Sequence, residues 1–404
     1  MRSDLIFLVV PALLFADVQA EAVDLSFSGF ADGRIIAPSG ETSWLNGGLG
    51  KFTFGGNGGN ARFVQAVGQG SLSLDDDLNV VAVARAEPNQ PSGINALEAY
   101  LSWHPQSDDN LQWSAKVGAF FPTISLENDD LGWTSPYTLT PSAINSWIGD
   151  ELRTLGGEAV IRWHTDVGTF SPMMALFCCN EPAGILIADR GWSMDDIPTG
   201  LFGRVPLPDA TETLFHAAVP GSAGLFNQID SRVGWYAGAS WQMADIGKLS
   251  LVRYDNEADP ASKTASDTSW ATHFWSLGAR TQFGSLVLIA QGITGNTMIV
   301  PRPGLVSLTN FQSAFLLASY DWDDWRLSGR EDQFQTRHPA ATPSPFSEDG
   351  HASTASLSWS GFDWLRLTGE VIAMDSRRGE YVQAGLGSPV QNATQFQLNA
   401  RVFY

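Results

Sequence analysis

Residues 395–404 read QFQLNARVFY, and polar and apolar side chains alternate through this segment up to its end on Tyr404. The apolar positions are Phe396, Leu398, Ala400, Val402 and Tyr404, and the polar positions are Gln395, Gln397, Asn399 and Arg401. Successive side chains of a β-strand point to opposite faces. The segment is therefore predicted to be a strand with one apolar and one polar face.

The same alternation recurs along the chain, as in the segment that contains Leu97, Ala99 and Leu101. Further segments with this period are 111–119, 155–163, 233–242 and 365–373. Beyond residue 20 no run of 18 apolar residues exists, which excludes a membrane protein built from helices. In a closed transmembrane barrel, lipid-facing and lumen-facing residues alternate along every strand. The pattern therefore favours an all-β, closed antiparallel transmembrane barrel.

The connections between these segments alternate between short and long. Short turns rich in Asp, Gly, Asn and Ser are expected near 75–78, 105–110, 164–168, 243–247, 282–285, 321–324 and 360–363. Long loops are expected near 35–61, 88–94, 122–152, 179–228, 257–267, 295–308, 335–350 and 375–391. Seven turns and eight loops predict about sixteen strands, with periplasmic turns, extracellular loops and both termini in the periplasm.

Tryptophan placement supports a membrane boundary at the short turns. The chain has 15 Trp, and those within a few residues of a short turn are Trp103, Trp113, Trp163, Trp241, Trp322, Trp325, Trp359 and Trp364. The indole ring is apolar with one polar N–H, so it collects at membrane–water interfaces. Tryptophans that only filled a soluble core would not concentrate at one set of strand ends.

The N-terminus reads as a secretory signal at 1–20, with Arg2 followed by an apolar run at 5–15. Val18 and Ala20 place small residues at the −3 and −1 positions of a cleavage site. The run is too short to span a bilayer as a helix. We expect residues 21–404 to form a single barrel domain, with 122–152 as a possible constriction loop.

Composition limits the other classes of function. The net charge of −20 gives no general attraction to nucleic acid. Cys178 and Cys179 are adjacent and cannot build a disulfide framework. The six histidines stand in no recognisable catalytic or zinc-binding context, and no calcium loop is present. We therefore expect no enzyme, no cofactor and no metal site.

Charged residues of the predicted lumen are the candidate functional residues. By strand parity the basic side chains that point inward are Lys116, Arg162, Arg326, Arg330, Arg366 and Arg401. The acidic side chains of the 122–152 loop are Glu127, Asp129, Asp130, Asp150 and Glu151. If this loop enters the barrel, acids face a basic wall, and the transverse field filters solutes by size and charge. Alternatively, the arginines pair with lumenal carboxylates such as Glu158, Asp332 and Glu370 and only keep the lumen polar.

The chain resembles the bacterial outer-membrane porin class. The resemblance rests on the signal peptide, the sixteen apparent strands, the enlarged third loop and the closing strand with its terminal aromatic residue, which in that class is usually Phe. The segment from Gly118 to Pro122, leading into Leu126, Glu127 and Asn128, is loosely similar to the phosphate-selective porin group. The resemblance implies a location in the bacterial outer membrane and a possible homotrimer.

Four functions remain open from the sequence. The first is a water-filled channel through which small hydrophilic solutes or ions diffuse passively across the outer membrane. The second is a substrate-specific gated channel or receptor, in which the 179–228 loop or a ligand plugs the lumen. The third is an outer-membrane enzyme, and the fourth is a soluble exported β-protein. The expected partners are the solute and the membrane lipid.

Overall fold

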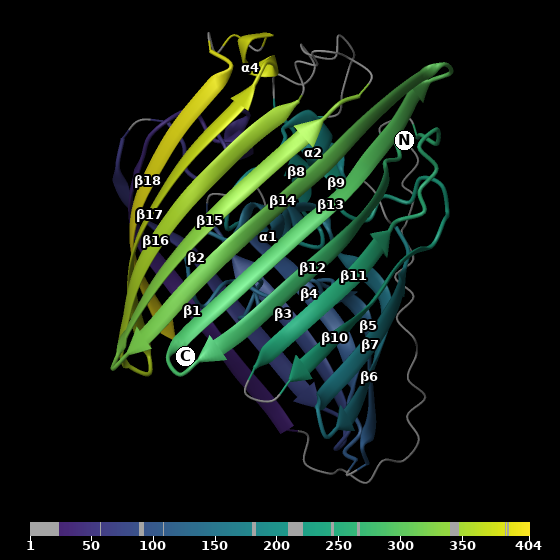
Figure 1. Cartoon of the computed structure of the whole chain (residues 1–404), viewed down its shortest axis with the longest axis vertical. Helices are drawn as coiled ribbons and strands as arrows, with labels where there is room; N and C mark the ends of the chain where they lie inside the picture. The colour runs from purple at the N-terminus through teal and green to yellow at the C-terminus, as the bar shows by residue number, and fades with distance from the viewer. Residues whose placement is uncertain are drawn as a thin grey trace.

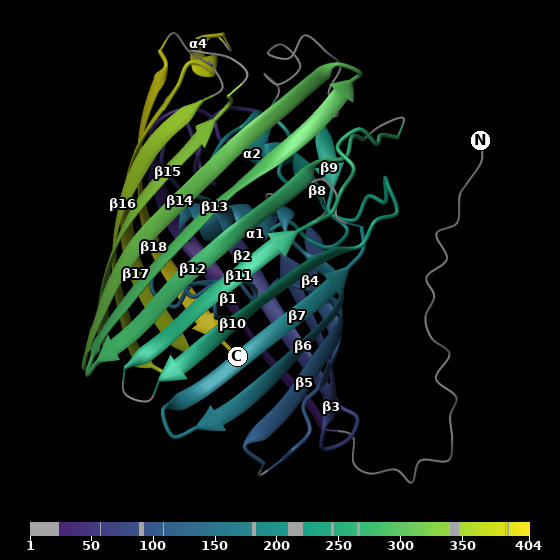
Figure 2. The ribbon, with the colours of Figure 1, turned by 45° about the vertical axis from the view of Figure 1, so that its right-hand side comes forward.

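The computed structural model describes residues 24–404 except 57, 89–92, 108, 180–182, 209–220, 244–245, 265–266, 340–346, 384 and 386–387. The predicted signal segment 1–20 lies outside these residues. The described chain is nearly all β and forms one closed antiparallel barrel of sixteen strands (Figures 1 and 2). No described helix is long and apolar enough to cross a membrane.

The wall is built from consecutive hairpins, so each strand pairs with its neighbours in the chain. Its strands are β1 Asp24–Pro38, β2 Asn60–Ser73, β3 Leu78–Ala86, β4 Ile94–Trp103, β5 Leu111–Phe120, β6 Thr154–Thr165, β7 Gly168–Phe177, β10 Gly234–Met243, β11 Gly247–Asp255, β12 Ala271–Phe283, β13 Leu286–Arg302, β14 Leu305–Trp322, β15 Trp325–Arg337, β16 Glu348–Phe362, β17 Leu365–Arg378 and β18 Val390–Phe403. The remaining elements are η1 Trp44–Asn46, α1 Ala143–Glu151, α2 Ile185–Asp189, the pair β8 Arg204–Pro206 and β9 Ser222–Gly224, and α4 Glu380–Gln383.

The closing strand predicted from 395–404 is β18, and it completes the barrel by pairing with both β17 and β1. The Tyr404 amide donates to the Gly29 carbonyl, and the Gly29 amide donates to the Tyr404 carbonyl, both at 3.1 Å. Every edge strand is thereby paired, which removes the exposed backbone groups that lipid cannot satisfy.

Each of the seven predicted short turns falls between two paired strands at one end of the barrel, which is the lower end in Figure 1; residues 108 and 244–245 of these turns lie outside the described residues. The prediction of a long loop at 295–308 is wrong. There β13 and β14 continue as a ladder to the pair Arg302–Leu305, and Gly304 turns the chain at φ +81°. The β-branched residues of this stretch extend the strands, and only the Pro and Gly residues at its centre form a turn.

The alternation of faces is confirmed over most of the wall, and among the segments predicted from the alternation β4 departs from it. Ala99, Leu101 and Trp103 point outward as expected, but Leu97 is fully buried inside the barrel. The register between β3 and β4 shifts at Val83/Ala84 because the chain bulges there. A bulge adds one residue to a strand and reverses the side on which the following residues point.

Twelve of the 15 tryptophans fall into two groups. The girdle tryptophans lie on the outer face beside the short turns and are substantially exposed: Trp103, Trp113, Trp163, Trp241, Trp322, Trp325 and Trp364. Trp322 and Trp325 stack across a turn with ring centroids 6.4 Å apart. A second group is buried inside the barrel: Trp44, Trp133, Trp147, Trp192 and Trp270. The interior of the barrel therefore has an apolar core.

Candidate functional site: a plugged lumen

Two loops fold into the barrel and fill it. We call residues 121–153, between β5 and β6, and 183–201, which follow β7, the plug. Every residue of α1 and α2, the two helices of the plug, is buried. Figures 1 and 2 show both helices enclosed by the strands of the wall. The plug packs against the wall in the way that a soluble protein packs around its core.

The centre of this packing is Trp147 on α1. Its ring lies 5.4 Å from that of Phe274 on β12 and 5.1 Å from that of Phe311 on β14. Trp192 of the plug completes the group at 6.0 Å. Burying rings of this size removes a large apolar area from water. This level of the lumen is therefore filled by aromatic side chains, in contrast to the polar lining expected of an open pore.

Arg330 of β15 fixes the first plug loop to the wall. Its guanidinium donates to Glu127 of the plug at 2.6 Å and to Asp332 of its own strand at 2.7 Å. It also donates to the plug carbonyls of Thr140 and Pro141 at 2.8 and 3.0 Å. The side chains of Arg330, Glu127 and Asp332 are all fully buried. Each charge is therefore shielded from water and is stabilised by its ion-pair partner instead.

A second cluster, on β1 and β18, holds the other part of the plug. Asp32 accepts from Arg401 at 2.8 Å and from Arg34 at 3.3 Å. Arg34 in turn reaches Asp196 of the plug at 2.5 Å. Asp196 also accepts from the Thr53 hydroxyl at 2.8 Å. The plug, the wall and the loop after β1 are therefore joined in one ionic network.

Glu348 at the start of β16 joins the same loop to the plug. Its carboxylate lies 2.5 Å from the ammonium of Lys51 and accepts from the Trp192 amide at 3.0 Å. Arg378 at the end of β17 donates to the plug carbonyls of Ala188 and Asp189 at 3.0 and 3.2 Å. Burial lowers the pKa of Lys51 to about 8, although Glu348 opposes the shift.

Asp150 and Glu151 join the two halves of the plug to each other. Glu151 accepts from the amide of Gly184 and from that of Leu186, the latter at 2.6 Å, at the start of α2. Asp150 pairs with Arg190 at 3.3 Å. Burial raises the pKa of Glu151 to about 7 and raises that of Asp150 well above its ordinary value. These two predicted constriction acids thus lie inside the closed plug, away from the basic wall.

On the side of the short turns, the inward faces of the strands are partly exposed and strongly charged. Lys116 pairs with Glu158 at 3.1 Å, and Arg280 pairs with Asp129 at 2.7 Å. Arg326 pairs with Asp321 at 2.7 Å. We call this region the vestibule, lined by Lys116, Arg162, Lys248, Arg280, Arg326 and Arg366 with Asp129, Asp130, Glu158 and Asp321.

Strand parity predicted that these cations point inward, and the structure shows that they differ in burial. Lys116, Arg162, Arg326 and Arg366 lie in the vestibule, and Arg330 is buried against the plug. Arg401 stands opposite Arg366 across the ladder and is buried against Asp32 of β1. Of the predicted acids, only Glu127 contacts a predicted cation, Arg330. Their roles in selectivity stay a prediction.

Several functional candidates were missed from the sequence. Lys248 and Arg280 are inward residues of β11 and β12, and strand parity could have found them. Lys51 and Arg378 lie in segments read as surface loops. Nothing in their local pattern indicates that the loops fold inward and bury a charge.

Comparison with known proteins places the fold. No protein-family model and no curated protein sequence matches this chain. The outer-membrane channel DcaP of Acinetobacter baumannii is similar in structure, with a TM-score of 0.57 at 10% identity over 96% of this chain and 100% of that one. OmpT, an outer membrane protein of Vibrio cholerae, has a TM-score of 0.55 and 9% sequence identity, with 96% of this chain and 100% of that chain covered. An anion-selective porin from Comamonas acidovorans has a TM-score of 0.52 and 12% sequence identity, with 95% of this chain and 100% of that chain covered. The chain therefore has the closed sixteen-stranded barrel fold of bacterial outer-membrane porins.

Proposed function

We propose that this protein is a gated porin-type channel of the bacterial outer membrane, described here in its closed form. The observation that carries the proposal is the plug, which fills the lumen and is attached to the wall by ion pairs and hydrogen bonds. Side-chain contacts of this kind can exchange for water without breaking the wall, whose strands are held by their own ladders. The proposal thus develops the gated alternative among the sequence-based hypotheses.

The outer surface supports a membrane location. On β5 to β10 the outward side chains are apolar, including Val117, Met174 and Leu176, and the girdle tryptophans border them at the turn end. Polar groups line the vestibule, so small hydrophilic solutes or ions are the class that would cross. Charged and hydrogen-bonding groups at the plug would select among these solutes, and transport would require no bond of the solute to be broken or formed.

The proposal is tested by recording single channels from the folded protein in a planar bilayer. The expected record is a channel that is closed most of the time, with discrete openings. Steady conductance from a wild-type protein with no closures would overturn the gate and support a permanently open diffusion pore. Silence under every condition, from a barrel that is folded by heat-modifiable mobility, would argue against a channel. The homotrimer and the similarity to phosphate-selective porins stay predictions.

Opening is expected to increase as the pH rises from 5 to 8. Burial raises the pKa of Glu151 to about 7 and that of Glu380 to about 6, and it also raises the pKa of Asp189 and Asp195. A carboxyl with a raised pKa in the closed form stabilises that form below its ordinary pKa of about 4.5. This contribution is lost as the pH rises through 6 and 7. The pKa of Lys51, about 8, lies above the pH range in which these carboxyls lose their protons.

The size of this effect follows from the shifts. Each unit of pKa difference corresponds to about 1.4 kcal/mol, or tenfold in the open-to-closed ratio. We expect the open probability to rise about ten- to hundredfold between pH 5 and 8. Glu151→Gln should flatten the profile. A profile that falls with pH, or one unchanged in the variant, would contradict the assignment.

The open channel is expected to prefer anions. Among the described residues, Arg162, Lys248 and Arg366 have no carboxylate within 4.0 Å, whereas the acids of the vestibule are engaged by other cations or by the backbone. Replacing Arg162 and Lys248 by Gln should reduce the anion-to-cation permeability ratio roughly fivefold, since a unit charge at 4 Å is worth about 1 kcal/mol in water. The reversal potential in a salt gradient measures this ratio. A cation-selective wild type would refute the prediction.

A further inference from the structure

We propose that a cleft between the wall and the plug, at the loop end of the barrel, is a binding site for a neutral solute that carries neighbouring hydroxyl groups. The cleft lies between the loop ends of β3 and β4 on one side and residues 197–203 on the other, and we call it the mouth cleft. Its volume is about 460 Å³, within the range of about 300–1,000 Å³ that is usual for small-molecule sites. The inference deepens the proposed function, on which it rests, by naming a class of solute.

The wall side of the mouth cleft carries an acid and a base next to each other. Strand alternation turns Arg85 of β3 inward, and Glu87, two residues further on, is buried on the same side. The Arg85 Nε lies 3.5 Å from a carboxylate oxygen of Glu87, and the two side chains are only 3% and 5% exposed. Asn95 of β4 stands opposite Arg85 across the ladder. The pair is therefore enclosed, and its two charges cancel.

Both members of this pair have hydrogen-bonding atoms without a partner. The Arg85 guanidinium donates from Nη2 to the Asp196 carbonyl of the plug at 2.9 Å. Its Nε and Nη1, and Oε1 of Glu87, make no hydrogen bond with the described part of the chain. A buried polar group that lacks a partner is destabilising and is rare in folded proteins. A molecule that accepts from Arg85 and donates to Glu87 would satisfy all of these atoms.

The chemistry of the pair selects a neutral solute. An anionic group would be attracted by Arg85 and repelled by Glu87, and a cationic group would meet the reverse. Either charge would also lose hydration inside the cleft. A hydroxyl group donates one hydrogen bond and accepts others. Two neighbouring hydroxyls can therefore accept from Arg85 and donate to Glu87 without adding a charge.

The remaining lining suits the carbon skeleton of such a solute. Leu97, Ile197 and Pro198 are buried and apolar, and Phe202 is 82% exposed at the same cleft. The face of an aromatic ring carries negative charge density, which attracts C–H groups. A ring with hydroxyls on its edge and C–H groups on its faces, such as a sugar, presents both kinds of surface.

The plug covers the atoms that the solute would reach. The Leu201 amide donates to the Ala96 carbonyl of β4 at 2.7 Å. Gly200 lies so close to Asn95 that a Cβ at position 200 would come within 2.3 Å of the Asn95 Cβ. A solute therefore reaches Arg85 and Glu87 as residues 197–201 move away from β4. Binding thus begins where the plug is attached to the wall.

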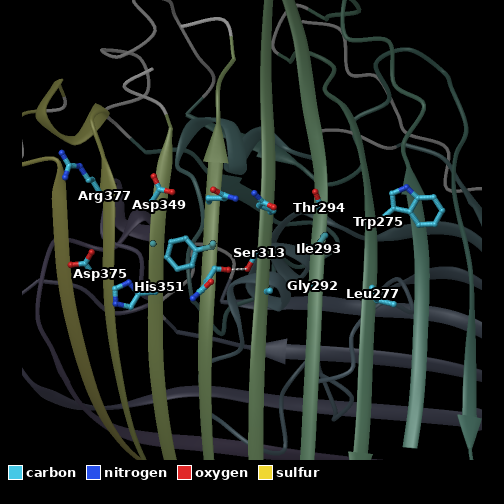
Figure 3. A pocket seen from close by; sticks show the side chains of 16 residues that line it. Trp275, Leu277, Gly292, Ile293, Thr294, Ser313, Asp349, His351, Asp375 and Arg377 are labelled. Atoms are coloured by element: carbon cyan, nitrogen blue, oxygen red, sulfur yellow. Dashed lines mark hydrogen bonds between the residues drawn. The ribbon is translucent and has the colours of Figure 1, made fainter. Parts of the chain in front are cut away.

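A larger hollow, of about 880 Å³, does not share these features. Figure 3 shows its lining side chains on adjacent strands from Trp275 on β12 to Arg377 on β17. Asp349, His351 and Arg377 are exposed there, on the outer face of the wall. Within the described residues, none of its lining side chains has a buried polar atom that lacks a partner. This outer hollow provides a control position.

The test compares three sugars that differ only at carbon 6: D-glucose, D-glucuronate and 6-amino-6-deoxy-D-glucose. Their binding to the folded protein in detergent is measured by equilibrium dialysis at pH 8. Burial raises the pKa of Glu87 to about 7, so its carboxylate is charged at this pH. We expect glucose to bind at least about fivefold more tightly than either charged sugar. Tighter binding of a charged sugar, or no binding of any of them at about 10 mM, would overturn the proposal.

Two variants of the pair should shift the preference in opposite directions. Glu87→Gln leaves the Arg85 charge unbalanced, so glucuronate should gain about tenfold relative to glucose. Arg85→Gln leaves the Glu87 charge unbalanced, so the amino sugar should gain by a similar factor. The control Arg377→Gln, in the outer hollow, should leave the binding of all three sugars unchanged. A general loss of packing cannot produce opposite shifts, and if one variant does not fold, the other still gives the sign.

Unchanged preference in a folded variant of the pair, or an equal shift in Arg377→Gln, would refute the site. Binding in detergent is measured whether or not the barrel conducts. A protein that binds glucose but shows no channel activity would therefore contradict the proposed function alone. A gated channel that binds none of the sugars would contradict this inference alone.

Discussion

Glu348→Gln is expected to raise the open probability of the channel by about two to four powers of ten, because removing one partner of a buried ion pair costs about 3–5 kcal/mol. The substitution keeps the shape of the side chain but leaves the Lys51 ammonium, 2.5 Å away, without its counter-charge. Lys51 is fully buried in the closed form, and opening of the plug returns it to water. Single-channel recording measures the effect directly.

The control for this prediction is the neighbouring residue. Asp349→Asn changes a carboxylate on the outer face that is 65% exposed and pairs with an exposed arginine. Exposed pairs of this kind contribute little, so the open probability should stay within about threefold of the wild type. The double variant Lys51→Met/Glu348→Gln removes both charges and should recover part of the closed state. Equal opening in Glu348→Gln and Asp349→Asn would show that the pair does not hold the plug.

Trp147→Ala is expected to destabilise the closed plug by about 3–5 kcal/mol, the usual cost of truncating a buried Trp. The ring contacts Trp192 of the plug and two phenylalanines of the wall, and no part of it is exposed. The cavity left behind would remove the apolar contact between α1 and the wall. Hydrogen exchange of the amides in 143–151 should accelerate by at least about a hundredfold, and openings should become more frequent.

The matched control is another tryptophan of the same chain. Trp364 lies in the outer girdle and is 54% exposed. Trp364→Ala should weaken anchoring at the membrane interface and leave exchange in α1 unchanged. If both substitutions accelerated exchange in α1 equally, the effect would come from the barrel as a whole, and the role of Trp147 at the plug would be refuted.

These two predictions separate the two attachments of the plug. Glu348 holds the loop after β1 through its ion pair with Lys51, and it holds residues 188–192 through the hydrogen bond from the Trp192 amide. Trp147 acts on α1, through apolar packing. Opening in Glu348→Gln without faster exchange in α1 would show that the second plug loop moves alone.

The wall of the barrel was determined by the sequence alone. Alternation has a period of two residues and depends only on which side faces lipid, so segments such as 395–404 could be assigned without knowing their neighbours. The turns were found for the same reason, since Asp, Gly and Asn act within a few residues. The pattern failed where it depended on pairing: the bulge that turns Leu97 inward and the ladder that replaces the 295–308 loop are both set by the adjacent strand.

The interior was decided by the tertiary structure. Arg330 could be placed on the inner face by parity, but its partners Glu127 and Asp332 are separated from each other by some two hundred residues and meet only because the 121–153 loop folds inward. Lys51 and Glu348 meet in the same way. The residues through which loops contact one another follow no periodic pattern in the sequence. A charged residue of a loop also looks the same in the sequence whether it is solvated or buried. The wall is thus determined by local sequence patterns. The gate is determined by the closed barrel, which brings distant loops together in one buried space where each charge needs a partner.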